Sequence, residues 1–233
     1  MVDKVCGTTA EAVADVFDGA VIMVGGFGDA GVPGRLLEAL RERRRKGLVI
    51  VHNGAGRGDH FVSGLIKDGA VRRVVASMPR ASPHFAELYL QGKVELELVP
   101  QGTLVERIRS AGAGLGGFYT PTGVGTELAE GKEVRTIDGR QYVFERALHA
   151  DFAFVKAHRG DRLGNLTYRM AMRNFNPVMA TAATTVIAEV DEVVAAGSLP
   201  VEEVHTPGIF VDHVVQAERH PLLFQPEAEG RLL

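Results

Sequence analysis

The sequence has a single cysteine and no long apolar run, and each of these absences excludes a class of protein. The one thiol, Cys6, rules out an internal disulfide framework and favours a reducing compartment. No segment approaches the roughly 20 apolar residues that are needed to cross a bilayer. The first residues also lack the basic and then apolar pattern of a signal peptide. We therefore expect a cytoplasmic protein without a membrane partner.

The chain also lacks a surplus of charge of one sign. It has 26 Lys and Arg against 29 Asp and Glu, which gives a net charge of −3. Because a protein that binds nucleic acid through the phosphates needs an excess of cations, this balance argues against a nucleic-acid partner. The basic run at 41–46 fits the solvated end of a helix better than a phosphate-binding patch, since cations suit the negative pole of a helix.

The groups that usually carry catalysis are scarce. The sequence has no Gly-x-Ser-x-Gly turn, and Cys6 has no candidate metal partner beside it, so an incidental thiol is the better interpretation than a nucleophile. The eight His residues are scattered without the spacing of metal ligands, and we expect no metal site. If the chain is part of an enzyme, part of the active site is therefore missing from it.

The sequence does contain a regular alternation of helices and strands. With 233 residues, 45% of them hydrophobic, and neither a repeat nor a linker, we expect one domain over 1–233, with a core at about 8–215 and a peripheral tail at 218–233. The alternation predicts an α/β fold, a mainly parallel doubly wound sheet flanked by helices. The expected helices cover 8–17, 33–45, 61–67, 83–90 and 104–110, and the expected strands 20–24, 48–51, 71–76, 94–99, 151–156, 166–169 and 185–190.

A small insertion interrupts this alternation. The segment 111–126 is too rich in glycine for a helix or an ordinary strand, and a long loop inside a compact domain is usually functional. Asp138-Gly139 is a strong turn signal between strands expected at 134–136 and 141–144, so a β-hairpin follows the loop. The segment 207–212 is expected to close the core.

The segment from Asp18 to Pro33 predicts a buried strand, a glycine-rich turn and the start of a helix. Such a corner lies at the carboxyl end of a strand, where backbone N–H groups and the helix dipole favour an anion. The turn formally matches the dinucleotide fingerprint G-x-G-x-x-G. The acid that should hold the ribose is missing, however, because His52 and Asn53 stand at the end of the next strand. A dinucleotide oxidoreductase is therefore a minor alternative.

Gln101 follows another predicted strand, within Pro100-Gln101-Gly102. Its amide could donate to a developing oxyanion, or it could merely cap the next helix or bond a neighbouring loop. The spacing alone does not separate these roles.

Several motifs resemble the A subunit of the family I 3-oxoacid CoA-transferases. The first reads Asp18-Gly-x-x-Ile-Met-Val-Gly-Gly-Phe-x-x-x-Gly-x-Pro33, and the others follow in one order over about 15–215. They lie at 98–109, 118–126, 150–156, 160–165, 173–177 and 206–211. Two positions differ: Gly54 stands where the family usually has Asn, and Val124 where many members have Tyr.

This resemblance implies half of an active site. The family's nucleophilic Glu lies in a Glu-Asn-Gly context on a homologous B subunit, and that tripeptide is absent here. The resemblance implies an A₂B₂ assembly, ping-pong transfer of CoA from succinyl-CoA to a 3-oxoacid, and no permanently bound cofactor beyond the coenzyme A thioester as substrate. It assigns oxyanion stabilisation to Gln101. It assigns the CoA and substrate wall to Gly25, Gly26, Phe27, Gly28, Asp29, Ala30, Gly31 and Asn53.

The acceptor acid is suggested by three further segments. Residues 131–140, 148–153 and 156–158 look most like 3-oxoadipate transferases, and acetoacetate is the second choice. A dicarboxylate needs a cation for its distal end, for which loop position suggests Arg57, Arg80 or Arg173. A non-catalytic acyl-ligand-binding module is the alternative from another class.

Overall fold

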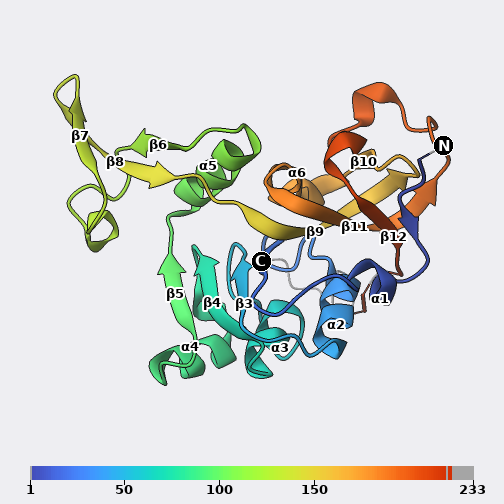
Figure 1. Cartoon of the computed structure of the whole chain (residues 1–233), viewed down its shortest axis with the longest axis horizontal. Coiled ribbons are helices and arrows are strands. Elements are labelled where there is room, and N and C mark those ends of the chain that lie inside the picture. Colours follow the sequence, from blue (N-terminus) through green and yellow to red (C-terminus); the bar gives the residue numbers. More distant parts are fainter. Residues whose placement is uncertain (1, 219, 222–233) are drawn as a thin grey trace, which may run out of the picture.

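The computed structural model describes residues 2–218 and 220–221, and most of the expected tail at 218–233 lies outside them. The large sheet of the described residues has nine strands, eight of which follow the order β1-β12-β11-β9-β2-β3-β4-β5, and every pairing along this path is parallel (Figure 1). The short β10 joins β9 in the antiparallel sense. The predicted α/β fold is confirmed. The strands are β1 (Val5–Cys6), β2 (Val21–Val24), β3 (Leu48–Val51), β4 (Val71–Ala76), β5 (Glu95–Leu98), β9 (Ala150–Asp161), β10 (Leu166–Thr167), β11 (Ala183–Val194) and β12 (His213–Gln216).

Helices cover both faces of this sheet, and each face has its own apolar core. The helices α1 (Thr9–Ala12), α2 (Gly34–Glu42), α3 (Phe61–Lys67) and α4 (Pro83–Leu90) pack on one face, and α5 (Gln101–Gly112) and α6 (Asn176–Ala180) on the other (Figure 1). Alternate residues of β9 divide between the two cores, with Phe154 on the first face and Val155 on the second. Because successive side chains of a strand point to opposite faces, such a strand reads as one continuous apolar run.

A second, three-stranded antiparallel sheet projects from the body of the molecule at the left of Figure 1. It consists of β6 (Gly117–Thr120), β8 (Arg140–Arg146) and β7 (Val134–Ile137). Asp138 and Gly139 have φ of 50° and 78° in the tight turn between β7 and β8, as the hairpin prediction requires. The expectation that 111–126 contains no strand is wrong, because β6 pairs with β8 there.

Several helices and strands differ in length from the prediction, most clearly the strands whose length is set by pairing with distant segments. The first helix ends at Ala12 instead of residue 17, and α2 ends at Glu42 instead of residue 45. The strands β9 and β11 each run for 12 residues, because they pair with each other along most of their length. β12 was not predicted, and the segment expected to close the core holds the 3₁₀ turn η5 (Gly208–Phe210) before it.

Short 3₁₀ turns complete the described chain: η1 (Pro79–Ala81), η2 (Glu127–Ala129), η3 (Met170–Arg173) and η4 (Val201–Glu203). None of the helices in the described ranges has the length and apolar character needed to span a membrane.

Candidate functional site

The predicted site residues lie at the carboxyl ends of neighbouring parallel strands. The glycine loop, residues 25–31, follows β2, Asn53 follows β3, and Gln101 follows β5. Since β2, β3, β4 and β5 are consecutive neighbours at about 4.8 Å each, the strands that carry the loop and Gln101 lie roughly 14 Å apart along this edge. The three turns share one edge, as predicted, and form a line along it.

The tip of the glycine loop is a tight turn open to solvent. The Phe27 N–H donates to the Ala30 carbonyl at 3.0 Å, and the Ala30 N–H donates back to Phe27 at 3.2 Å. Gly28 has φ of 60°, and a Cβ added there would have nothing within 4 Å. Within the described chain, the N–H groups of Gly28 and Asp29 have no acceptor. The tip therefore carries backbone donors without a partner in the described chain, as the glycine-rich sequence predicts.

Asn176 fixes the base of this loop from beneath. Its side chain is fully buried, and its Oδ1 accepts a hydrogen bond from the Lys156 N–H at 2.9 Å. Its Nδ2 donates to the carbonyl oxygens of Gly31 at 3.0 Å and Met172 at 2.7 Å. A Cβ on Gly25 would lie 1.8 Å from Oδ1 of Asn176, so glycine is needed there for space. Asn176 was not predicted as a site residue, although it lies in the quoted motif at 173–177.

The positive end of α2 is already occupied by a carboxylate of the chain itself. Oε2 of Glu189 accepts hydrogen bonds from the N–H groups of Arg35 at 2.9 Å and Leu36 at 3.0 Å. Burial raises the pKa of Glu189, while the neighbouring Lys156 and the two amide donors act in the opposite direction. These two N–H groups are therefore already bonded, and an anion that the helix dipole favours is Glu189 of the chain itself.

His52 and Asn53 tie the second turn to its neighbours. His52 Nδ1 lies 2.9 Å from the carbonyl oxygen of Val24, so Nδ1 carries the proton. Burial lowers the pKa of His52 and favours the neutral ring. The Asn53 carbonyl accepts hydrogen bonds from the N–H groups of Ser77 and Met78. Asn53 is 8% exposed, and its side chain makes no hydrogen bond within the described residues.

Gly54 explains one departure from the family pattern. A Cβ at this position would lie 2.9 Å from the carbonyl oxygen of Met78, with which Gly54 forms a β-bridge. An asparagine in the same backbone position would therefore require a shift of the neighbouring loop.

Gln101 is exposed and is the first residue of α5. The helix has no side-chain cap, and the Gln101 amide bonds no other group in the described part of the chain. Among the residues described, Gln101 therefore neither caps the helix nor bonds a neighbouring loop, and its side-chain amide is available as a hydrogen-bond donor.

Of the three candidate cations, Arg57 lies in a loop after β3, Arg80 in η1 and Arg173 in η3, and all are exposed. Within the described residues, none of Arg57, Arg80 and Arg173 forms an ion pair. Arg173 lies between Met172, whose carbonyl bonds Asn176, and Asn174, whose Nδ2 donates to the Ala30 carbonyl at 2.9 Å. η3 is therefore attached to the glycine loop.

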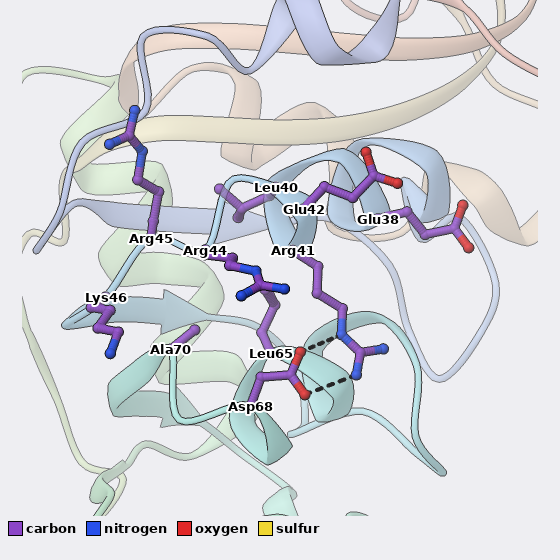
Figure 2. A pocket seen from close by; sticks show the side chains of 10 residues that line it. All are labelled: Glu38, Leu40, Arg41, Glu42, Arg44, Arg45, Lys46, Leu65, Asp68 and Ala70. Carbon is purple, nitrogen blue, oxygen red and sulfur yellow. Dashed lines mark hydrogen bonds and ion pairs between the residues drawn. The ribbon is translucent and has the colours of Figure 1, made fainter.

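A cavity of about 870 Å³ lies at the opposite, amino edge of the sheet. Basic and acidic side chains both line it, and Figure 2 shows Arg41 bound to Asp68 by two hydrogen bonds of 2.5 and 2.9 Å. This ion pair lowers the pKa of Asp68 and raises that of Arg41. The cavity is remote from Gln101 and the glycine loop, and the bidentate pair fits the predicted solvated helix end. Across the described ranges, no group of three or more His, Cys, Asp or Glu residues is arranged to hold a metal ion.

Known proteins share this sequence and this fold. The chain is 56% identical over 217 residues to the A subunit of the 3-oxoadipate CoA-transferase of Pseudomonas putida, covering 92% of this chain and 94% of the relative. It is 46% identical over 212 residues to the A subunit of the probable succinyl-CoA:3-ketoacid coenzyme A transferase of Bacillus subtilis, covering 91% and 89%.

Among solved structures, the acyl-CoA transferase of Escherichia coli O157:H7, in a thioester complex with CoA, has the same fold, with a TM-score of 0.84 and 24% identity. The match covers 96% of this chain and 49% of that protein, so this chain spans about half of its length. The family resemblance seen in the motifs extends over residues 7–217, which match the coenzyme A transferase family, and the chain belongs to that family.

Proposed function

We propose that the chain is the A subunit of a succinyl-CoA:3-oxoacid CoA-transferase whose acceptor is 3-oxoadipate. The observation that carries the proposal is the free side-chain amide of Gln101 on the same sheet edge as the glycine loop. This combination supplies an oxyanion donor and a backbone-lined wall, the two parts that an acyl transfer needs from a chain without a nucleophile. The name of the P. putida relative supports the acceptor.

The reaction we propose uses a glutamate of a partner chain. Its carboxylate attacks the thioester carbonyl of succinyl-CoA, the C–S bond breaks, and a mixed anhydride and the CoA thiolate form. The thiolate then attacks the glutamyl carbonyl and releases succinate, which leaves a glutamyl-CoA thioester. The acceptor carboxylate runs the same two steps in reverse and regenerates the glutamate, so no proton is gained or lost.

In this scheme Gln101 donates to the carbonyl oxygen that becomes negative at each attack. The tip of the glycine loop offers the N–H groups of Gly28 and Asp29 to the anionic parts of the substrates, and residues 25–31 with Asn53 form the wall beside them. No permanently bound cofactor enters the cycle.

The proposed reaction requires a second, different subunit that supplies the glutamate. The relatives from P. putida and B. subtilis are each named as the A subunit of their enzymes. The E. coli acyl-CoA transferase is about twice as long as the part that this chain matches. We infer a homologous B subunit that carries the glutamate, an A₂B₂ assembly, and a cytoplasmic location.

The test is a reconstitution. The chain is purified alone and together with the product of a neighbouring reading frame that contains Glu-Asn-Gly, and exchange of CoA between succinyl-CoA and 3-oxoadipate is measured. We expect activity only in the complex. Full activity of the isolated chain would contradict its role as one half of the enzyme, and an inactive complex would contradict the reaction.

Acetoacetate is the second candidate acceptor, because the B. subtilis relative is named for 3-ketoacids in general. The ratio of kcat/KM for 3-oxoadipate to that for acetoacetate decides between them, and we expect 3-oxoadipate to have the larger value.

A further inference from the structure

The N-terminus of α2 is capped from a distant part of the chain. The helix follows the glycine loop through Pro33, and no local side chain caps it. Instead, Glu189, which lies on β11 and is fully buried, accepts the N–H groups of Arg35 and Leu36 through a single oxygen. Since these amides belong to the first turn, Glu189 determines where the loop ends and the helix begins.

Glu189 is paired with a buried lysine on the neighbouring strand. Lys156 is in register with Glu189, and its Nζ lies 3.3 Å from Oε1 of Glu189 and 2.7 Å from Oδ1 of Asp191. Asp191 in turn contacts His158 at 3.2 Å. The contacts of Nζ are ion pairs without the alignment of hydrogen bonds. Lys156 thus compensates the charge of Glu189, whereas the hydrogen bonds that Glu189 accepts come from the N–H groups of α2.

Lys156 also belongs to the support at the other end of the loop. Its backbone N–H donates to Oδ1 of Asn176, the residue that contacts Gly25 and bonds Gly31. Asn176, beneath the glycine loop, and Glu189, at the start of α2, therefore both contact Lys156 of β9.

Stability alone does not explain this arrangement. Replacing a buried ion pair by apolar side chains of similar volume is often neutral or stabilising, because desolvation offsets the attraction of the charges. An apolar side chain, however, offers no acceptor to the amides of α2. The structural feature that requires residue 189 to be polar is the pair of N–H groups at the exit of the glycine loop.

We propose that Glu189, held and neutralised by Lys156, is a positioning residue that sets the glycine loop for binding and catalysis by fixing the first turn of α2. This role rests on the proposed function only in that the loop is the wall of the substrate site. The geometric part, a loop held by the carboxylate of Glu189, is independent of the reaction.

The test compares two variants of the full chain, in the assembly in which it is purified. Glu189→Gln and Glu189→Met both remove the charge and keep the length of the side chain, but only Gln keeps an acceptor oxygen. Amide hydrogen exchange of residues 25–37 and the values of kcat and KM for CoA transfer are measured for both. We expect exchange to be at least 10-fold faster, and kcat/KM at least 10-fold lower, in the Met variant than in the Gln variant.

Asp161→Asn is the matched control. Asp161 is also a buried carboxylate that accepts two backbone N–H groups, those of Leu163 at 3.0 Å and Asn165 at 2.9 Å, at the far end of β9. This variant should leave exchange in residues 25–37 unchanged.

Each other outcome also decides the question. Equal exchange in the Gln and Met variants would overturn the positioning role. If Glu189→Met does not fold because Lys156 is left without this partner, the double variant Lys156→Met/Glu189→Met takes its place. Failure of the Gln variant to fold would show that the charge is what matters, and would also overturn it. A wild-type assembly without CoA-transfer activity would contradict the proposed function, while the exchange result would still test the positioning role.

Discussion

The side-chain nitrogen of Asn176 donates to the carbonyl oxygen of Gly31 at 3.0 Å, which joins two residues 145 positions apart. The same side chain leaves no room for a Cβ on Gly25, because that atom would lie 1.8 Å from its Oδ1. The Asn176 side chain cannot move away from such a Cβ without losing its hydrogen bonds to the backbone. The glycine loop is thus shaped by the side chain beneath it as well as by its own glycines.

We expect Gly25→Ala to destabilise the fold through this contact. Overpacking costs about 1–3 kcal/mol, and each buried group that loses its partner when Asn176 moves adds about 1–3 kcal/mol. The double variant Gly25→Ala/Asn176→Ala should be no less stable than Asn176→Ala alone, since the clash is then absent. Urea unfolding of the three variants gives the free energies.

Gly28→Ala is the control for that series. A Cβ at Gly28 meets nothing within 4 Å, and only its φ of 60° is unfavourable. The expected cost is about 1–2 kcal/mol. If Gly25→Ala proved as mild as Gly28→Ala, the fixed position of Asn176 would be refuted.

Gln101→Ala should lower kcat by roughly 10²–10³ in the reconstituted complex, which is the usual effect of removing one oxyanion donor. The midpoint of urea unfolding should not change, because the Gln101 side chain is exposed and unbonded in the described chain. Gln91→Ala, at the exposed end of α4, serves as the control for activity and should leave kcat unchanged; its side chain donates to Glu87 at 3.2 Å, an exposed contact whose loss should move the midpoint only slightly. An unchanged kcat for Gln101→Ala removes this residue from the mechanism.

Local signals in the sequence predicted the elements that depend on neighbouring residues. The bounds of α3, β4 and α4 were correct, and α4 begins where Ser82 accepts the Phe85 N–H and Pro83 takes the first helical position. Elements that depend on remote partners were missed or shortened. β12 is a four-residue strand that exists by pairing with β11 and β1, and no local pattern marks it.

The residues of the candidate site also fall into those with local sequence signals and those that depend on distant partners. The glycine loop and Gln101 were proposed as site residues because glycine spacing and a polar residue after a strand are local features. Asn176 and Glu189 were not, because the groups that they bond lie far away in the sequence. The helix dipole at Pro33 was correctly seen as favouring an anion, but the sequence could not show that Glu189 would be that anion.

The stability of the fold should fall in mild acid because of His52. Burial lowers its pKa below the value of 6.5 for an unperturbed histidine, so the unfolded chain binds the proton more readily than the folded one. Stability is then fully present above pH 6.5 and is lost as the pH falls below it, by at most about 1.4 kcal/mol per pH unit for this one group.

His52→Asn should reduce that loss. The Asn side chain can still donate to the Val24 carbonyl, but it does not titrate. Urea unfolding at several pH values between 5 and 8 gives the slope, with His149→Asn, at an exposed histidine, as the control. A slope that is the same in His52→Asn and the wild type would contradict this origin of the acid sensitivity.

Arg80 is the cation that we expect to hold the distal carboxylate of a dicarboxylic acceptor. It lies in η1, which two residues separate from the end of β4, and Gln101 follows β5, which pairs with β4 at one strand spacing of about 4.8 Å. That separation suits a substrate whose reacting carbonyl is at Gln101 and whose other carboxylate is a few bonds away. Arg57, one strand further from Gln101, is the matched control.

Arg80→Gln should therefore raise KM for 3-oxoadipate by about 10- to 100-fold, the effect of losing one hydrogen bond between charged groups. KM for acetoacetate, which has no second carboxylate, should stay within about 2-fold, since nothing then contacts residue 80. Arg57→Gln should change neither value. If Arg57→Gln or Arg173→Gln raised KM for 3-oxoadipate while Arg80→Gln did not, the dicarboxylate would lie in the other direction along the sheet edge, toward the glycine loop.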